Sequence, residues 1–295
     1  QSLIWAGIEP VFCDVDPETH QLDIAQLDSL LDDDVTAIMG INLWGGASKV
    51  AELEEYARNR GLKLYFDSAH AFGCEVNNKK ISGFGSLEVF SFHATKILSA
   101  TEGGCISTND DNIAARLRSI RPSYDNHPSA EIIKVANARM SEAQAAIALL
   151  SLEDFPKNQK NNEAIFQCYS SLLEQVSGIN LVKPSGVSFS NYQYVVCEIN
   201  EAEFGLSRDQ LINILEAENI LARRYFYPGT HRIVEFENYA KYSRLPVTEK
   251  LCANCIQLPI GSPVDINSVT RICQIIHTAQ LENVSLRNFF DQGFV

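Results

Sequence analysis

Short apolar runs alternate with segments of helical spacing through the first half of the chain. The apolar runs, which predict strands, lie at 9–15, 35–44, 62–67, 88–93 and 103–109. Apolar residues that recur at helical spacing predict helices at 24–31, 50–61 and 110–121. Strands that alternate with helices are typical of a mostly parallel sheet sandwiched by helices. We therefore predict an α/β fold for this half.

The pattern changes after residue 140. A long helix is predicted over 141–176, and Pro156 inside it marks a break or kink. Later segments predict strands at 191–200 and 222–228 and helices at 207–220 and 266–282. We therefore predict a large domain over 1–155 and a smaller α+β domain over 156–295.

Composition narrows the class of protein without naming a function. The chain has 295 residues, of which 45% are hydrophobic and 21% charged, as in a globular protein with a sizeable core. The formal net charge is -13 and no basic patch is visible, so we expect no nucleic-acid partner. No apolar run has the length of a membrane span, so we expect no membrane partner.

The eight cysteines are scattered in a chain too long to need disulfide staples. We therefore expect reduced thiols and a cytoplasmic location. Cys252 and Cys255 form a lone C-x-x-C, whereas a zinc site would need a second pair. We favour two small apolar residues one turn apart on a helix, and a redox role stays open.

Polar side chains follow two of the predicted strands. Asp67 ends the strand at 62–67, and His70 follows it. Ser91, His93 and Lys96 lie at the end of the strand at 88–93. Because ligands in an open α/β sheet sit off the carboxyl ends of the strands, these side chains would share one crevice if the two strands are neighbours.

This set of residues admits more than one chemistry. A lysine in apolar surroundings can form a Schiff base, and a nearby aspartate can keep a pyridinium nitrogen protonated, which together suit pyridoxal phosphate (PLP). A metal-dependent hydrolase could instead use Asp67, His70 and His93 as ligands, although Lys96 would then be unexplained. Asp67 could also be a plain helix cap, Lys96 a surface residue and the histidines core residues, so composition alone does not select PLP.

Four sequence blocks point to a family. PVFCDVDPETHQLD, FDSAHAFG, VFSFHATKILSATEGG and NARMSEAQAA occur in this order. Together they resemble the DegT/StrS-type sugar aminotransferases, which belong to the aspartate aminotransferase fold group of PLP enzymes. The resemblance runs from about Leu3 to the last predicted helix, and four blocks in order with matching gaps make it very specific.

The resemblance implies a role for each matching cofactor-site residue. Lys96 is the implied Schiff-base lysine and proton carrier, and Asp67 the implied partner of the pyridinium nitrogen. His70 is expected beside the ring and Ser91 at the phosphate. Asn137 matches an asparagine that reaches the phosphate of the neighbouring subunit, which implies a homodimer with shared active sites.

The substrate residues are carried over with less support. The segment ARRYFYPGTH resembles one that borders the sugar site, so Arg224 and Tyr225 are weaker candidates there, together with His93. The implied reaction takes an amine from L-glutamate through pyridoxamine phosphate to a nucleotide-linked keto sugar, of the dTDP 3- or 4-keto-6-deoxyhexose type, with ping-pong kinetics. Such reactions belong to deoxysugar biosynthesis, including that of lipopolysaccharide O-antigens.

The chain departs from the family's pattern at its start. The family's N-terminal segment, with a first helix, a Gly-Thr/Ser phosphate loop and an aromatic residue over the ring, has no match before Gln1. The sequence is then either a fragment or a copy that lost part of its cofactor site. The second case would make it an impaired, aminotransferase-like interaction protein. Thr101 is a smaller departure, since glycine usually precedes the EGG motif.

Overall fold

The computed structural model describes residues 1–121, 135–233 and 244–292. The chain forms two compact units. We call Asp33–Lys157 with Ser185–Asn191 the four-strand unit, and Gln1–Asp32, Asn158–Pro184 and Tyr192–Val295 the three-strand unit.

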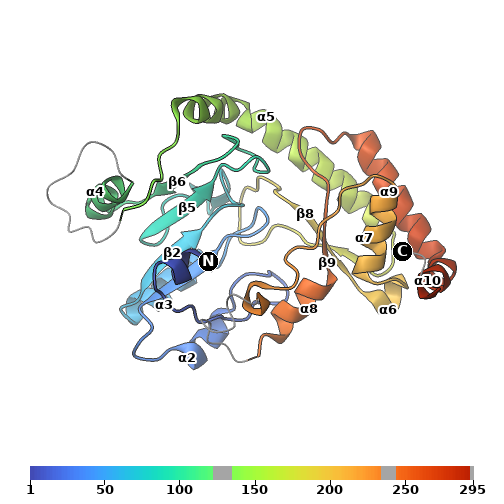
Figure 1. Cartoon of the computed structure of the whole chain (residues 1–295), viewed down its shortest axis with the longest axis horizontal. Helices are drawn as coiled ribbons and strands as arrows, with labels where there is room; N and C mark the ends of the chain where they lie inside the picture. The colour runs from blue at the N-terminus through green and yellow to red at the C-terminus, as the bar shows by residue number, and fades with distance from the viewer. Residues whose placement is uncertain (122–134, 234–243, 293–295) are drawn as a thin grey trace. The chain divides into compact units, whose positions relative to one another are not determined.

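The four-strand unit holds one sheet of strand order β1-β2-β5-β6 (Figure 1). Its strands are β1 (Ala37–Ile41), β2 (Lys63–Asp67), β5 (Leu87–Ser91) and β6 (Gly104–Ser107). The first three are parallel and β6 is antiparallel to β5. The predicted α/β class with a mostly parallel sheet is confirmed.

Helices and a small hairpin complete this unit. They are α3 (Val50–Asn59), α4 (Asp111–Ile120), the first part of α5 (Glu142–Leu173), and the paired strands β3 (Glu75–Val76) and β4 (Lys79–Lys80). Helix α3 buries Leu53 and Ala57, and Leu53 and the ring of Phe66 in β2 both lie close to Gly40 of β1. One face of the sheet is therefore packed against α3.

The opposite face of this sheet is apolar and open to solvent in the described chain. The register places Ile41, Asp67, Val89 and Ile106 in one row across the four strands. The three apolar members of this row are about two-fifths exposed, at 42%, 39% and 46%. Asp67 thus stands in an apolar row.

The three-strand unit is α+β. Its antiparallel sheet has the order β7 (Ile179–Leu181), β8 (Val195–Ile199) and β9 (Cys255–Leu258). Its helices are α1 (Ser2–Trp5), η1 (Ile24–Gln26), α2 (Leu27–Leu30), the rest of α5, α6 (Glu201–Phe204), α7 (Arg208–Ala217), η2 (Thr230–Arg232), α8 (Pro246–Asn254), α9 (Ile266–Leu281) and α10 (Asn283–Asp291).

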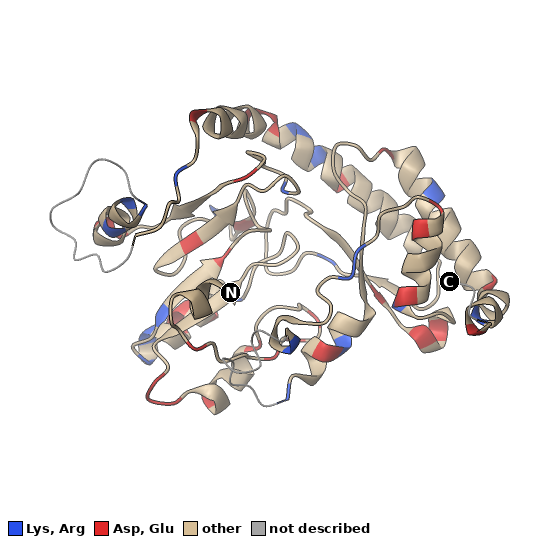
Figure 2. Cartoon of the chain, viewed as in Figure 1, with Lys and Arg blue, Asp and Glu red and all other residues tan. Residues whose placement is uncertain are grey.

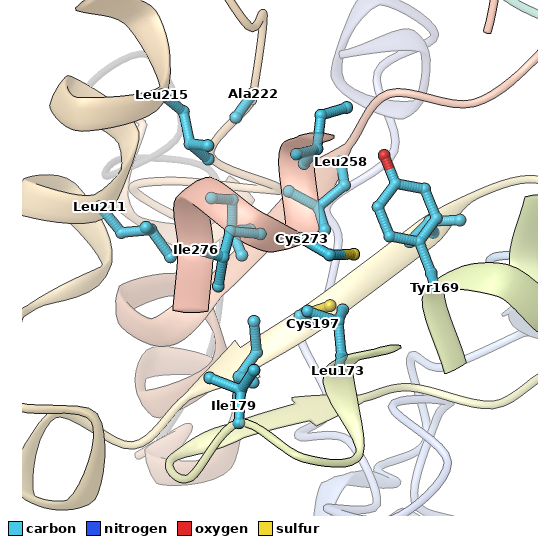
Figure 3. Packing of buried hydrophobic residues seen from close by; sticks show 14 of the residues in the cluster. Tyr169, Leu173, Ile179, Cys197, Leu211, Leu215, Ala222, Leu258, Cys273 and Ile276 are labelled. Carbon is cyan, nitrogen blue, oxygen red and sulfur yellow. The ribbon is translucent and has the colours of Figure 1, made fainter. Parts of the chain in front are cut away.

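The core of this unit lies between the sheet and its helices. Figure 3 shows Leu211 and Leu215 of α7 near Ile276 of α9, with Cys197 of β8 below Cys273. All five are buried. The thiols of Cys197 and Cys273 are free, and burial raises the pKa of Cys273 to about 12. Both cysteines therefore serve as small apolar side chains.

Several predicted elements differ from the structure. Residues 9–15 form no strand and make only isolated bridges, of which one joins Val15 to Leu22. Residues 222–228 likewise form only the bridge of Arg223 with Gln257. Few side chains of either stretch are buried, since only Asp14 is buried in 9–15 and only Ala222 in 222–228.

Helix α5 runs through Pro156 without a break, so this proline does not end it. The C-x-x-C pair does not lie on one helix, because Cys252 is in α8 while Cys255 opens β9. Both thiols are buried and free, and burial raises the pKa of both, which argues against the redox alternative.

Lysines and arginines of the described chain are scattered among acidic residues over many elements (Figure 2). This distribution differs from the contiguous basic face of nucleic-acid binders. Among the helices that the structure describes, none is long and apolar enough to cross a membrane.

Candidate active site

The site is built on the carboxyl ends of β2 and β5. These strands are adjacent and parallel, with Asp67 opposite Val89. Asp67 therefore ends its strand at the same sheet edge where β5 ends at Ser91. The condition that the sequence left open, that the two strands be neighbours, is met.

The turn after β2 holds the Asp67 side chain in place. The backbone N–H of Ala69 donates to its Oδ1 at 3.0 Å. The N–H of Ser68 donates to the carbonyl of Val89 at 2.8 Å, which ties this turn to β5. The carboxylate is half-buried at this end of the strand.

His70 lies under the same turn. Its side chain is buried, and its carbonyl accepts a hydrogen bond from Nδ2 of the buried Asn191 at 3.0 Å. Burial, followed by the positive charge of Lys96, lowers the pKa of His70 to about 3. His70 is therefore neutral at neutral pH.

A tight turn after β5 presents Lys96. The N–H of His93 donates to Ser91 Oγ at 3.3 Å, and the N–H of Lys96 donates to the carbonyl of His93 at 2.9 Å. The Lys96 side chain is half-buried, whereas His93 is exposed and lies 3.7 Å from the exposed Glu102. The turn thus carries an amine and a hydroxyl at one strand end.

Glycine is required where β6 passes β5. Gly104 pairs with Ser91, and a Cβ there would lie 2.4 Å from the carbonyl oxygen of Phe90. Only a residue without a side chain lets the strands approach this closely. Thr101, before this glycine pair, adopts a left-handed φ of 65° that a β-branched residue rarely takes.

Three predicted site residues belong to other segments of the chain, and their part in the site stays a prediction. Asn137 is exposed ahead of α5. Arg224 belongs to the three-strand unit, where its Nε donates to Asp209 Oδ1 at 2.6 Å. Tyr225 lies in the same unit, its ring 5.7 Å from that of Tyr194.

The metal alternative lacks a ligand set. Within the described ranges, no group of three histidine, cysteine or acidic side chains is placed to hold a metal ion. His70 is moreover buried and interacts with the cation of Lys96, an unfavourable setting for a metal ligand.

The donor set at the sheet edge fits PLP. It combines a primary amine at Lys96, a carboxylate at Asp67 and a hydroxyl at Ser91 on two adjacent strands. These are the groups that an aldehyde, a pyridine nitrogen and a phosphate require. Sequence reasoning missed the polar residues beneath the site, Asn42, Ser68 and Glu88. Glu88 did carry a signal, since it alternates onto the buried face of β5.

Comparisons with known proteins agree with this chemistry. The DegT/DnrJ/EryC1/StrS aminotransferase family matches residues 1–277. A dTDP-4-amino-4,6-dideoxy-D-glucose transaminase of Shigella dysenteriae is 33% identical over 276 residues, which cover 93% of this chain and 75% of that protein. A GDP-perosamine synthase of Vibrio cholerae is 28% identical over 278 residues, with the same coverage of 93% and 75%.

A solved structure extends the similarity to the fold. The crystal structure of DesI in the presence of its TDP-sugar product superposes with a TM-score of 0.93 at 34% identity. The match covers 98% of this chain and 74% of the DesI chain, so this chain spans about three quarters of the DesI length. The chain belongs to the DegT/DnrJ/EryC1/StrS aminotransferase family and is a PLP-dependent aminotransferase.

Proposed function

We propose that the chain moves an amino group from L-glutamate to the keto carbon of a dTDP-linked 3- or 4-keto-6-deoxyhexose. The family and the names of its relatives support a nucleotide-sugar substrate. The dTDP assignment is supported by the similarity to DesI, at 34% identity, and to the Shigella dysenteriae transaminase, at 33% identity. The observation that supports the chemistry is that Asp67 ends β2 and Ser91 ends the adjacent parallel strand β5, with Lys96 in the turn that follows β5.

The proposed roles follow from the chemistry of each group. Lys96 would hold the cofactor aldehyde, Asp67 the ring nitrogen and Ser91 the phosphate. When bound, PLP supplies an electron-accepting ring that carries the amino group between the two substrates.

The protein supplies the proton chemistry. The Asp67 carboxylate, fixed by the N–H of Ala69, would favour a proton on the ring nitrogen. The Nζ of Lys96, once released from the cofactor, would take a proton from the carbon of the amino donor and deliver it to the cofactor carbon, and would move a proton in the opposite direction when the keto sugar accepts the amine. His70, whose pKa is lowered to about 3 by burial and by the charge of Lys96, adds no second positive charge to the site.

The proposal includes a second copy of the chain. Asn137 is exposed, and this supports its proposed reach to the phosphate of a neighbouring subunit. Arg224 and Tyr225 are proposed at the sugar nucleotide, with His93 as a weaker candidate. Free thiols throughout the chain are consistent with a cytoplasmic location. We propose that the chain acts there as a homodimer in deoxysugar or O-antigen synthesis.

A visible absorption spectrum tests the cofactor role. The chain with added PLP should show a visible band that is lost in Lys96→Ala and kept in Lys80→Ala, which removes an exposed lysine of β4. A colourless wild-type protein would contradict the proposal and favour the alternative of an impaired, aminotransferase-like interaction protein.

Substrate assays test the second half of the proposal. dTDP keto-deoxysugars with L-glutamate should give product with ping-pong kinetics. Turnover with GDP-linked but not dTDP-linked keto sugars would contradict the nucleotide assignment and leave the chemistry intact.

A further inference from the structure

A fully buried carboxylate lies directly beneath the proposed site. Glu88, the second residue of β5, has no exposed surface. Its Oε1 accepts a hydrogen bond from the N–H of Phe84 at 2.9 Å, and its Oε2 accepts one from Ser68 Oγ at 2.7 Å. Burial raises the pKa of Glu88, although these donors act against it. Burying such a group is costly, so it is a poor means of stabilising a sheet.

The carboxylate begins a chain of buried side chains that crosses three strands. Ser68 Oγ, which donates to Glu88, accepts from Asn42 Nδ2 at 2.9 Å. Asn42 Oδ1 in turn accepts from the N–H of Ser48 at 2.9 Å. Ser68, Asn42 and Ser48 are all buried. These hydrogen bonds therefore link the residues that follow β1 and β2 to the second residue of β5.

Backbone hydrogen bonds next to this side-chain network hold Asp67, the proposed partner of the pyridine nitrogen. The carbonyl of Asp67 accepts from the N–H of Asn42 at 2.9 Å, and the next residue, Ser68, is bound through both its N–H and its hydroxyl. The peptide that bears Asp67 is thus held on both sides by groups of neighbouring strands. Its side-chain direction is set by that backbone together with the N–H of Ala69.

We propose that Ser68 and Glu88 are positioning residues, which aim the Asp67 carboxylate at the ring nitrogen of PLP through the Glu88–Ser68–Asn42 hydrogen bonds. This inference rests on the proposed role of Asp67. An outer group that orients a ligating group commonly changes ligand affinity by about tenfold or more when it is removed. The geometry matches such a role, because Ser68, the residue next to Asp67, bonds through its hydroxyl to both Glu88 of β5 and Asn42 after β1.

The test compares Ser68→Ala with a matched control. Thr108→Val removes another hydroxyl of the four-strand unit, one that donates to the carbonyl of Ser86 at 2.7 Å, away from Asp67. Ser68→Ala should weaken PLP binding about tenfold and shift the NMR signal of PLP isotope-labelled at the ring nitrogen towards the unprotonated form. Thr108→Val should change neither quantity, even where it lowers the melting temperature as much.

A second measurement needs no cofactor. In the protein without PLP, exchange of the Ala69 amide should accelerate several-fold in Ser68→Ala and stay unchanged in Thr108→Val. Glu88→Gln keeps the side-chain volume but turns one acceptor into a donor. It gives the same comparison if Ser68→Ala does not fold.

The outcomes separate this inference from the function on which it rests. Wild-type PLP affinity and an unshifted ring-nitrogen signal in both Ser68→Ala and Glu88→Gln would overturn the positioning role. If Asp67→Asn also leaves the ring-nitrogen signal unshifted, the proposed role of Asp67 fails and the positioning role fails with it.

Discussion

Asp14 offers a sharp test of how the first segment is attached to the three-strand unit. Its buried carboxylate accepts three hydrogen bonds from the start of α8. The N–H of Val247 donates to Oδ2 at 3.0 Å, while the N–H and the hydroxyl of Thr248 donate to Oδ1 at 2.8 and 2.6 Å. Since Pro246 opens α8, these N–H groups belong to the first turn, which has no partners within the helix.

The magnitude follows from those bonds. A hydrogen bond to a charged group contributes about 1.5–3 kcal/mol, and loss of a helix cap costs roughly 0.5–2 kcal/mol. Because the three bonds are not additive, we expect Asp14→Ala to lower the free energy of unfolding by about 3 kcal/mol. Asp14→Asn keeps one acceptor and should cost about 1–2 kcal/mol. Glu18→Gln, an equal charge change at an exposed neighbour, should stay within about 0.5 kcal/mol of wild type.

The pH dependence gives an independent check. Burial alone would raise the pKa of Asp14, but the bonds from Thr248 and Val247 outweigh it and hold the pKa below its usual 3.8. A carboxylate with a depressed pKa stabilises the fold above the unfolded pKa, and that stability is lost as the pH falls through the folded pKa. The difference between wild type and Asp14→Asn in urea unfolding should therefore be constant above about pH 5 and shrink below about pH 4. A difference under about 0.5 kcal/mol at pH 7, or one that persists unchanged in acid, would refute the reasoning.

Two further predictions concern the site. Thr101→Gly should raise the free energy of unfolding by roughly 0.5–1 kcal/mol in a urea titration, because glycine relieves the left-handed φ of 65°; a loss of stability would contradict this strain. The His70 ring should show no NMR titration between pH 5 and 8, since its pKa is near 3, and it should titrate at higher pH in Lys96→Ala. Because the unfolded histidine binds its proton more readily, His70 should destabilise the fold increasingly as pH falls below about 6.5, and His70→Gln should flatten that slope.

The residues at the carboxyl ends of β2 and β5 could be predicted because the spacing of apolar residues and the ends of apolar runs are local properties of the sequence. Apolar runs that end at Asp67 and near Ser91 place both at carboxyl ends, and the structure needed only to show that the strands are neighbours. The stretch 9–15 misled because alternation cannot tell a paired strand from an extended segment. Its buried Asp14 is instead bound to α8, more than two hundred residues away in sequence.

The supporting network could not be predicted for a similar reason. Ser68 and Glu88 are separated by 20 residues, and their bond exists only once β2 and β5 pair. The sequence pattern indicates that Glu88 is a charged residue on an apolar strand face, but it does not predict which group donates a hydrogen bond to its carboxylate. The residues that support a site are therefore harder to infer than the residues that carry its chemistry.

The apolar row around Asp67 also sets the strength of its electrostatics. With Ile41 and Val89 beside it on an open face, the carboxylate interacts through water, where an opposite charge 4 Å away is worth about 1 kcal/mol. Any molecule or segment that covers this row expels water and lowers the local dielectric constant, and the same pair is then worth about 4 kcal/mol. The interaction energy between Asp67 and a protonated ring nitrogen therefore depends on whether this row is covered as much as on the carboxylate itself.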